Sequence, residues 1–216
     1  MGQPSIVQIR ERLANSFALD RLWRETMGLP AGDTKEMPLR AVISVLEASG
    51  TSYAVIGGVA MQLYSREPRT TLDVDLAVVR YDEIPREALV SAGFEHEGRH
   101  AHSDNWRAPG PGPRGQRTAV QFSAEDPGIG EAVARAQVFD AGGFQLRLAT
   151  AADLVVLKLA AAEDDRRRAS KRRQDLLDVV TLVEEFPDAV EAVPMLGRRI
   201  EQLTSKLLTL GRPRDP

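Results

Sequence analysis

The sequence predicts an α+β fold with a helical C-terminal part. Short β-rich runs broken by glycine and proline are confined to residues 53–148, and apolar residues at helical spacing lie on both sides of them. The chain has 216 residues and 43% apolar content, which is enough for one large domain or two small ones. We expect an N-terminal helical segment at 1–36, a sheet-containing core at 37–150 and a helical part at 151–216.

Two helices are predicted before the first strand. Apolar residues recur at helical spacing through residues 5–27, and the breaker-rich stretch GLPAGDT ends this segment. From Pro38 a second apolar set recurs at i, i+3, i+4 and i+7, and Gly50 stops it as a C-terminal cap would.

The middle of the chain alternates short strands with turns and short helices. The elements expected there are a strand at 53–56, a helix at 59–65, a strand at 71–79, a helix at 85–92, and strands at 118–122 and 144–148. A further strand is expected after the AGF stretch, whereas RAPGPGPRGQR is too rich in proline and glycine for either element.

Helices dominate the last part of the chain. The run AADLVVLKLAAA follows Thr150, a residue suited to cap a helix, and QDLLDVVTLVEEF carries apolar residues at helical spacing. The basic stretch RRRASKRR is expected to link these two helices. A further helix is expected near residues 198–210.

Composition excludes several kinds of site. The chain has no cysteine, which rules out a disulfide framework, a thiolate zinc site and a cysteine nucleophile. A net charge of −3 gives no overall attraction for nucleic acid, so a polyanion would need a local basic patch. No apolar run approaches the ~20 residues that span a bilayer, and the N-terminus lacks the apolar core of a signal peptide. We therefore expect a soluble, cytoplasmic protein with no membrane partner.

An Asp-Val-Asp triplet lies inside the strand predicted at 71–79. Side chains alternate between the two faces of a strand, so Asp73 and Asp75 share the face opposite to the neighbouring apolar residues. Mg²⁺ takes carboxylate oxygens together with substrate phosphates, and such an ion stabilises charge on a transferred phosphoryl group. A half-exposed strand with an acidic outer face is the alternative explanation.

A glycine pair precedes this strand. Gly57 and Gly58 lie between a strand and a short helix, where small residues let a phosphate approach backbone N–H groups and the positive end of the helix dipole. A simple strand-to-helix turn would use the same residues. The combination of glycine turn, short helix and carboxylate strand favours a phosphate and metal site.

The stretch from IGG through RTTLDVDL resembles the first motif of the nucleotidyltransferase superfamily that includes polymerase β. More narrowly, it resembles the AbiEii-type nucleotidyltransferases of type IV toxin–antitoxin systems. The resemblance implies a small mixed sheet with helices on one side and a cleft completed by the helical C-terminal part. It also implies that Asp73 and Asp75 hold Mg²⁺ or Mn²⁺. The residues that it implies for NTP binding are Gly57, Gly58, Arg69 and Thr71, and many members carry serine at the second glycine.

The same resemblance extends to the two C-terminal helices. Relatives carry a lysine on an apolar helix and a K/R-x-D-L-x-D pattern on the next, which implies catalytic roles for Lys158 and Asp175, with Asp178 on the same helical face. A lysine in an apolar run must extend to water or meet an anion, and a nucleotide phosphate would serve. Lys171 and Asp175 are spaced i, i+4, so an ordinary helical ion pair is the alternative.

One position departs from the superfamily pattern. A third carboxylate often comes from a later strand and activates the attacking hydroxyl, but the stretch TAVQFSAED has Gln121 in its place. Glutamine cannot act as a general base. Glu125, Asp126 or Asp175 would take the role, or positioning and metal charge would suffice, or the protein would be inactive.

We expect an enzyme that transfers a nucleoside monophosphate from an NTP to a hydroxyl of RNA, such as a tRNA, or of protein. The resemblance makes it the toxin of a toxin–antitoxin pair, with an antitoxin as partner. The basic run 166–173 would guide an RNA backbone or be a solvated linker. The alternatives are transfer to a small molecule, as in antibiotic modification, and a nucleotide-binding relative without activity.

Overall fold

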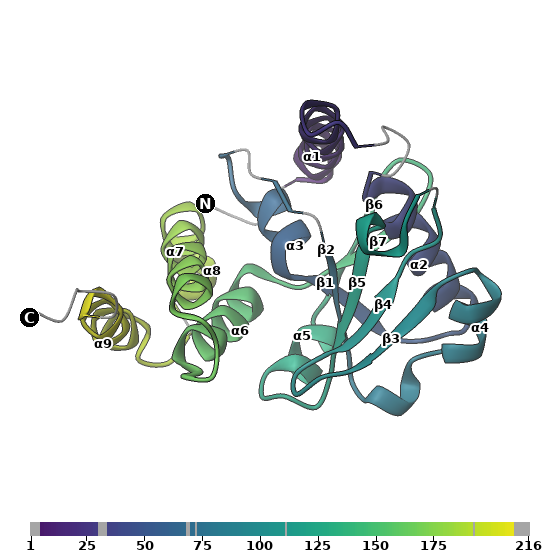
Figure 1. Ribbon diagram of the computed structural model, residues 1–216. Coiled ribbons are helices and arrows are strands. Elements are labelled where there is room, and N and C mark those ends of the chain that lie inside the picture. The colour runs from purple at the N-terminus through teal and green to yellow at the C-terminus, as the bar shows by residue number, and fades with distance from the viewer. Residues whose placement is uncertain are drawn as a thin grey trace, which may run out of the picture. The chain divides into compact units, whose positions relative to one another are not determined.

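The computed structural model describes residues 5–29, 34–67, 70–71, 73–110, 112–191 and 193–209 (Figure 1). The described residues divide into two compact units, one before and one after the boundary between Thr150 and Ala151. The first unit contains a seven-stranded mixed sheet with helices, and the second is helical in its described residues. The predicted α+β fold class is confirmed.

In the first unit, helices and strands alternate along the chain. The helices are α1 (Ile6–Thr26), α2 (Glu36–Ala48), α3 (Gly57–Tyr64), α4 (Arg86–Ser91) and α5 (Ile129–Ala134), with 3-10 turns η1 (Tyr81–Glu83) and η2 (Arg114–Gln116). The strands are β1 (Tyr53–Ile56), β2 (Asp73–Val78), β3 (Glu95–Arg99), β4 (Asp104–Arg107), β5 (Ala119–Ser123), β6 (Gln137–Asp140) and β7 (Gln145–Leu148). Their order across the sheet is β3-β4-β5-β2-β1-β7-β6. The pairs β2/β5 and β1/β7 are parallel, and the other neighbours are antiparallel.

Local sequence explains where α1 begins and where α2 ends. The Ser5 hydroxyl accepts a hydrogen bond from the Gln8 N–H, and the Gln8 side chain accepts one from the Ser5 N–H. This capping box starts α1. α2 ends at Ala48, and Gly50 follows with a left-handed φ of +66°. Both helices agree with the predictions.

Strand β2 lies in the middle of the sheet, between β1 and β5. All of β1 is buried, and the β2 residues Val74 and Leu76 have no exposed surface. They are paired in register with Val120 and Phe122 of β5, which are equally buried, and Trp106 of β4 continues the same row. One face of the central strands is therefore largely an apolar core.

Three elements of this unit have weak sequence signals. β4 reads DNWR and β6 reads QVFD, so both are short and rich in polar residues, while α5 has only six residues. β4 pairs with β3 on one side and β5 on the other, and β6 pairs with β7. Pairing with neighbouring strands, rather than β propensity, accounts for these two strands.

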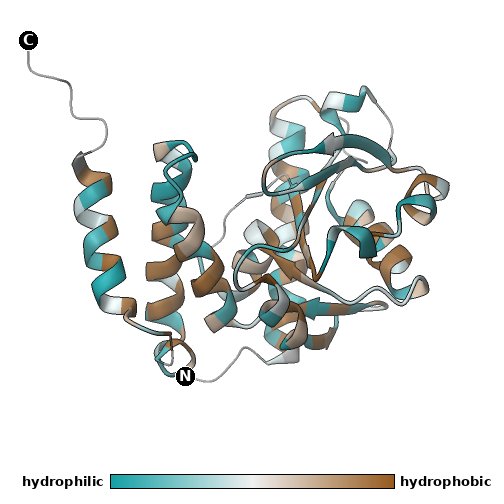
Figure 2. Cartoon of the chain, turned by 90° about the horizontal axis from the view of Figure 1, so that it is seen from below, coloured by the Kyte–Doolittle hydropathy of each residue, from teal (hydrophilic) through white to brown (hydrophobic). Residues whose placement is uncertain are grey.

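The second unit contains α6 (Ala151–Glu163), α7 (Ala169–Glu185), α8 (Pro187–Val190) and α9 (Leu196–Thr209) within its described residues. α6 and α7 pack against each other, and α9 packs against α7. Polar and apolar residues alternate along α9 in Figure 2, as in a helix with one buried face. No helix in the described ranges is long and apolar enough to cross a membrane.

The basic segment before α7 differs from the prediction. α7 begins at Ala169, so Lys171, Arg172 and Arg173 lie on the helix, and the prediction of a linker over the whole basic stretch was wrong. The Arg172 side chain is buried and its Nε donates to the Ala162 carbonyl at 2.7 Å, while Arg173 donates to a carbonyl of α9. Arginine and lysine are good helix formers, and these contacts hold the first turn of α7 in place.

Candidate active site

Asp73 and Asp75 are half-buried on β2, and they alternate with the fully buried Val74 and Leu76. The two carboxylates therefore belong to the face opposite to the apolar core. Leu72, expected on the apolar face, lies outside the described residues. The strand thus presents two carboxylates, two residues apart, on one side of the sheet.

The glycine turn lies directly against the second carboxylate. Ile56, the last residue of β1, is paired in register with Asp75, and α3 starts at the next residue. The Gly58 N–H donates to Asp75 Oδ2 at 3.2 Å. Gly57 has a left-handed φ of +61°, and a Cβ there would lie less than 3.0 Å from the Asp75 carboxylate. The glycine turn and the carboxylate strand therefore meet at Gly57 and Asp75. Glycine is required at position 57 both by its left-handed φ and by the lack of space for a Cβ.

Thr71 fills the space beside the second glycine. A Cβ added at Gly58 would lie less than 3.0 Å from both Oγ1 and Cβ of Thr71. The Thr71 hydroxyl thus occupies the place where a side chain at position 58 would begin, at the N-terminal end of α3. Arg69, the other residue expected to bind the nucleotide, lies outside the described residues.

Lys35 is a buried residue near this point that sequence reasoning missed. Its Nζ lies 3.3 Å from the Thr71 carbonyl, and its backbone N–H donates to the Asp20 carboxylate at 2.7 Å. Burial lowers the pKa of Lys35, the Asp20 carboxylate acts in the opposite direction, and Arg24 lowers the pKa further. Lys35 therefore ties the start of α2 to the segment that carries Thr71. An isolated lysine in a loop gives no sequence signal for such a position.

Gln121 is the β5 residue paired in register with Asp75. Its side chain belongs to the same face as the two carboxylates, which is where a third carboxylate would stand. Glu125 and Asp126 follow the C-terminal end of β5. There, Glu125 forms an ion pair with Arg99, and Asp126 lies 3.3 Å from His102. Their positions do not favour either residue as a substitute for Gln121. Within the described residues, no group of three or more His, Asp and Glu side chains could hold a metal ion.

Lys158 of α6 meets two carboxylates of α7 in the second unit. Its Nζ lies 2.8 Å from Asp175 Oδ1 and 2.7 Å from Asp178 Oδ2, and the three side chains are 14%, 7% and 3% exposed. Arg167 approaches the other oxygen of Asp175 at 3.1 Å. Burial lowers the pKa of Lys158, but the two carboxylates more than offset this effect, so its pKa lies above the ordinary value.

The partners of Asp175 differ from the alternative considered for the sequence. Its carboxylate is paired with Lys158 and Arg167, whereas Lys171 is exposed on α7. The ion pair is therefore a contact between two helices rather than an i, i+4 pair along one helix. Lys158 does meet an anion, as expected of a lysine in an apolar run, and the described partners are carboxylates.

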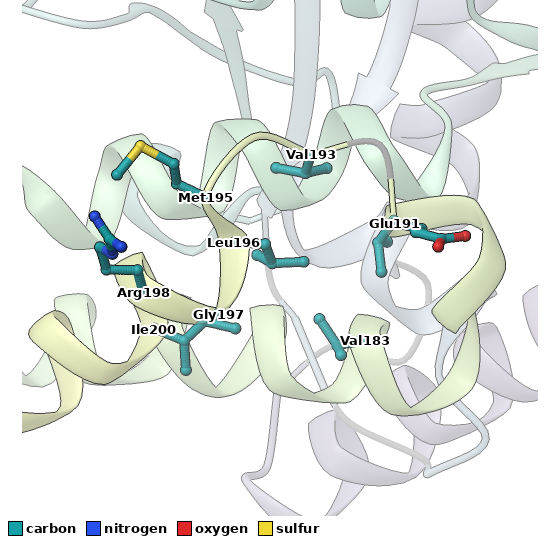
Figure 3. A pocket seen from close by; sticks show the side chains of 9 residues that line it. Val183, Glu191, Val193, Met195, Leu196, Gly197, Arg198 and Ile200 are labelled. Carbon is teal, nitrogen blue, oxygen red and sulfur yellow. The ribbon is translucent and has the colours of Figure 1, made fainter.

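The second unit also contains an open pocket, which is lined by residues between positions 183 and 200. Figure 3 shows it between the end of α7 and the start of α9, and its lining is mostly apolar, with Val183, Val193, Leu196 and Ile200 among the lining side chains. None of the residues predicted for catalysis or nucleotide binding lines it.

A sequence model of the family "Nucleotidyl transferase AbiEii toxin, Type IV TA system" matches residues 41–206. The chain belongs to the AbiEii family. The match includes the glycine turn, the carboxylate strand and the Lys158 cluster, whereas α1 and Lys35 precede it. No curated protein sequence matches this AbiEii family member.

One of the similar solved structures supports the fold of the family. An antigenic nucleotidyltransferase-like protein from Paracoccidioides brasiliensis is 21% identical, with a TM-score of 0.53 over 79% of this chain and 89% of that protein. ANT(2")-Ia in complex with adenylyl-2"-tobramycin is 11% identical, with a TM-score of 0.48 over 79% and 97%. JHP933 from Helicobacter pylori is 12% identical, with a TM-score of 0.40 over 80% and 88%. The first similarity supports the nucleotidyltransferase fold, and the weaker two bear on neither fold nor function.

Proposed function

We propose that this AbiEii family member transfers a nucleoside monophosphate from an NTP to a hydroxyl group of RNA and releases pyrophosphate. The observation that carries the proposal is the direct contact between the glycine turn and the carboxylate strand, made by the Gly58 N–H and Asp75. Glycine turns bind phosphate and paired carboxylates bind hard cations, and nucleotidyl transfer needs both next to each other.

The carboxylate pair fits a divalent cation. Asp73 and Asp75 share one half-buried face, and Gly57, which has no Cβ, lets the Asp75 carboxylate lie directly against the glycine turn. Mg²⁺ is commonly held by one or two carboxylates together with substrate phosphates. When bound there, Mg²⁺ or Mn²⁺ would offset the negative charge that develops on the transferred phosphoryl group.

The glycine turn and its neighbours would hold the triphosphate. The Gly58 N–H already donates to Asp75, but the other backbone N–H groups at the start of α3 and the positive end of its dipole favour an anion. The Thr71 hydroxyl lies beside them as a further donor. Arg69 is proposed to neutralise part of the phosphate charge, as expected from the sequence.

Lys158 and Asp175 are proposed to complete the catalytic set. Asp175, held between Lys158 and Arg167, has a fixed orientation, which suits a group that accepts the proton of the attacking hydroxyl. Lys158 supplies a cation that the two carboxylates keep protonated, suited to the charge of a leaving pyrophosphate. Asp175 thereby takes the role for which Gln121 is unsuited.

RNA is the proposed acceptor, with tRNA as one candidate. Arg168 and Lys171 are exposed, and neither makes an ion pair within the described residues, so both are available for phosphates. A protein hydroxyl is the second candidate. The AbiEii family also makes an antitoxin the natural partner of the chain. A small cationic antibiotic would gain no binding energy from these two positive residues, which disfavours it as the acceptor. The remaining alternative is a nucleotide-binding relative without activity, and Gln121 is the residue that favours it.

The proposal predicts transfer in vitro. Purified protein with Mg²⁺ or Mn²⁺ and each labelled NTP should move label into total RNA, and nuclease treatment should remove that label while protease treatment leaves it. Label lost to protease would point to a protein acceptor. Absence of transfer with all four NTPs and both metals, to RNA, to lysate protein and to aminoglycosides, would contradict the proposed enzyme.

The exposed cations give a separate prediction for the acceptor. Arg168→Gln and Lys171→Gln should each weaken RNA binding and make the negative slope of log K against log salt shallower by ~0.7, the value for one phosphate contact on a single strand. Arg198→Gln, an exposed arginine of α9, removes the same charge and should leave the slope unchanged. NTP binding should be unaffected in all three. Equal slopes in wild type and the first two variants would remove these residues from the RNA path.

A further inference from the structure

Three neighbouring strands place polar side chains in one row next to the carboxylate pair. Asp75 on β2 is paired in register with Gln121 on β5, and Gln121 is paired with Asn105 on β4. Residues directly opposed on adjacent strands point to the same face of a sheet. The row therefore runs from a proposed metal ligand across two side-chain amides, and it continues to Gly98 of β3, where a Cβ would meet no atom within 4 Å.

The two amides have unused hydrogen-bonding capacity. Within the described part of the chain, the Asn105 Oδ1 is buried without a hydrogen-bond partner, and the Gln121 side chain makes no hydrogen bond either. Both residues are half-buried. A side-chain amide offers two N–H donors and one carbonyl acceptor, and proteins rarely leave such groups unmatched at a half-buried position. A ligand would supply the missing partners.

The charge around the row narrows the ligand class. The neighbouring row on the same face consists of Asp73, Ala119 and Arg107, paired in register. The Arg107 guanidinium donates to Glu97 and to the Arg117 carbonyl, so its charge is already matched, and Ala119 leaves room beside Gln121. A phosphate would need an unmatched cation, which the row lacks, and the one carboxylate of the row, Asp75, is the proposed metal ligand rather than a partner for an ammonium group. Amides suit a neutral group with hydroxyls, each of which donates and accepts.

We propose that Gln121 and Asn105 bind the vicinal diol of a terminal ribose of the acceptor RNA and hold it beside Asp75. This assignment rests on the proposed function. It gives Gln121 a role that a carboxylate would not fill, because an amide orients a hydroxyl without taking its proton. Gln121 and Asn105 thus select the end of the acceptor RNA that binds, whereas NTP binds at the glycine turn.

The test measures binding, so it does not depend on turnover. The probe is a single-stranded RNA ending in CCA with a terminal ribose, and its partner is the same RNA ending in 2′,3′-dideoxyribose. Wild-type protein should bind the ribose end about tenfold more tightly, the order expected for loss of one or two hydrogen bonds. Gln121→Met and Asn105→Leu, which are close in size, should bind both RNAs equally and retain NTP affinity.

Ser123→Ala is the matched control, since Ser123 lies two residues further along β5 on the same face. It should keep the preference for the ribose end. Equal binding of both RNAs by the wild type, or an undiminished preference in both amide variants at unchanged thermal midpoints, would overturn the assignment. If either variant unfolds, the other still decides. Failure of the proposed enzyme would appear separately, as absence of label transfer by wild-type protein that still distinguishes the two RNA ends.

Discussion

Asp73→Asn and Asp75→Asn are each expected to reduce nucleotidyl transfer by about a thousandfold or more while leaving the thermal midpoint nearly unchanged. A bound divalent cation contributes several kcal/mol of transition-state stabilisation, and each 1.4 kcal/mol corresponds to about a tenfold change in rate. Folding should tolerate both changes, because two carboxylates on one strand face repel each other and an amide keeps an oxygen for the Gly58 N–H.

The measurement is single-turnover label transfer beside thermal unfolding of the same preparations. Glu131→Gln, an exposed carboxylate on α5, is the control for charge and should change neither quantity. A fall of the thermal midpoint by many degrees in either aspartate variant would show that the pair stabilises the fold rather than binds metal. Full activity in both variants would remove Asp73 and Asp75 from the site.

Lys158→Met is expected to lower the free energy of unfolding by about 3–5 kcal/mol, the typical cost of removing one partner from a buried ion pair. The loss leaves the Asp175 and Asp178 carboxylates, 7% and 3% exposed, without their shared cation. Combining Lys158→Met with Asp175→Asn and Asp178→Asn should recover most of the loss. Arg199→Met, which removes a more exposed pair with Glu163, should cost less than about 1 kcal/mol.

The pH dependence of the same pair has a definite sign. The pKa of Lys158 is raised above its ordinary 10.5 in the folded protein by its two carboxylates. Its stabilising contribution is therefore complete below pH 10.5 and is lost as pH rises through the folded-state pKa. Denaturant unfolding of wild type between pH 9 and 12 should show a loss of stability above about pH 10.5 that Lys158→Met lacks. Parallel curves would contradict the assignment.

Lys158→Arg separates the structural role from the catalytic one. Arginine keeps the positive charge toward Asp175 and Asp178, so most of the stability should remain, while the compact ammonium is replaced by a planar guanidinium. Transfer that falls in a stable Lys158→Arg protein would support a role in catalysis. Transfer that follows stability across all Lys158 variants would make the cluster purely structural.

Local periodicity determined most of the fold that sequence analysis recovered. The alternation of Val74 and Leu76 with the two aspartates indicated strand β2 and its two faces, and helical spacing indicated α1, α2, α6 and α7. Pairing between distant segments was not predictable in this way. The strands DNWR and QVFD are stabilised by pairing with neighbouring strands rather than by their own sequence. The start of α7 depends on the hydrogen bond from Arg172 to a carbonyl of α6.

The candidate site was predictable only where a motif was contiguous. The glycine turn and the carboxylate strand each have a local pattern, and the first motif of the family joins them. Lys35 lies outside the matched family segment and acts through a tertiary contact with the Thr71 segment. The partners of Lys158 are 17 residues away or more, so the sequence indicated the residues without indicating that they pair with one another.

The shared space at positions 58 and 71 has a consequence for how this site tolerates change over evolution. Because a Cβ at Gly58 would lie less than 3.0 Å from Oγ1 and Cβ of Thr71, the space holds one side chain rather than two. The sizes of the two residues are therefore linked, and substitutions there should not be additive. A chain that gains serine at position 58 needs a smaller residue at position 71, so the hydroxyl beside the proposed triphosphate position can come from either segment but not from both.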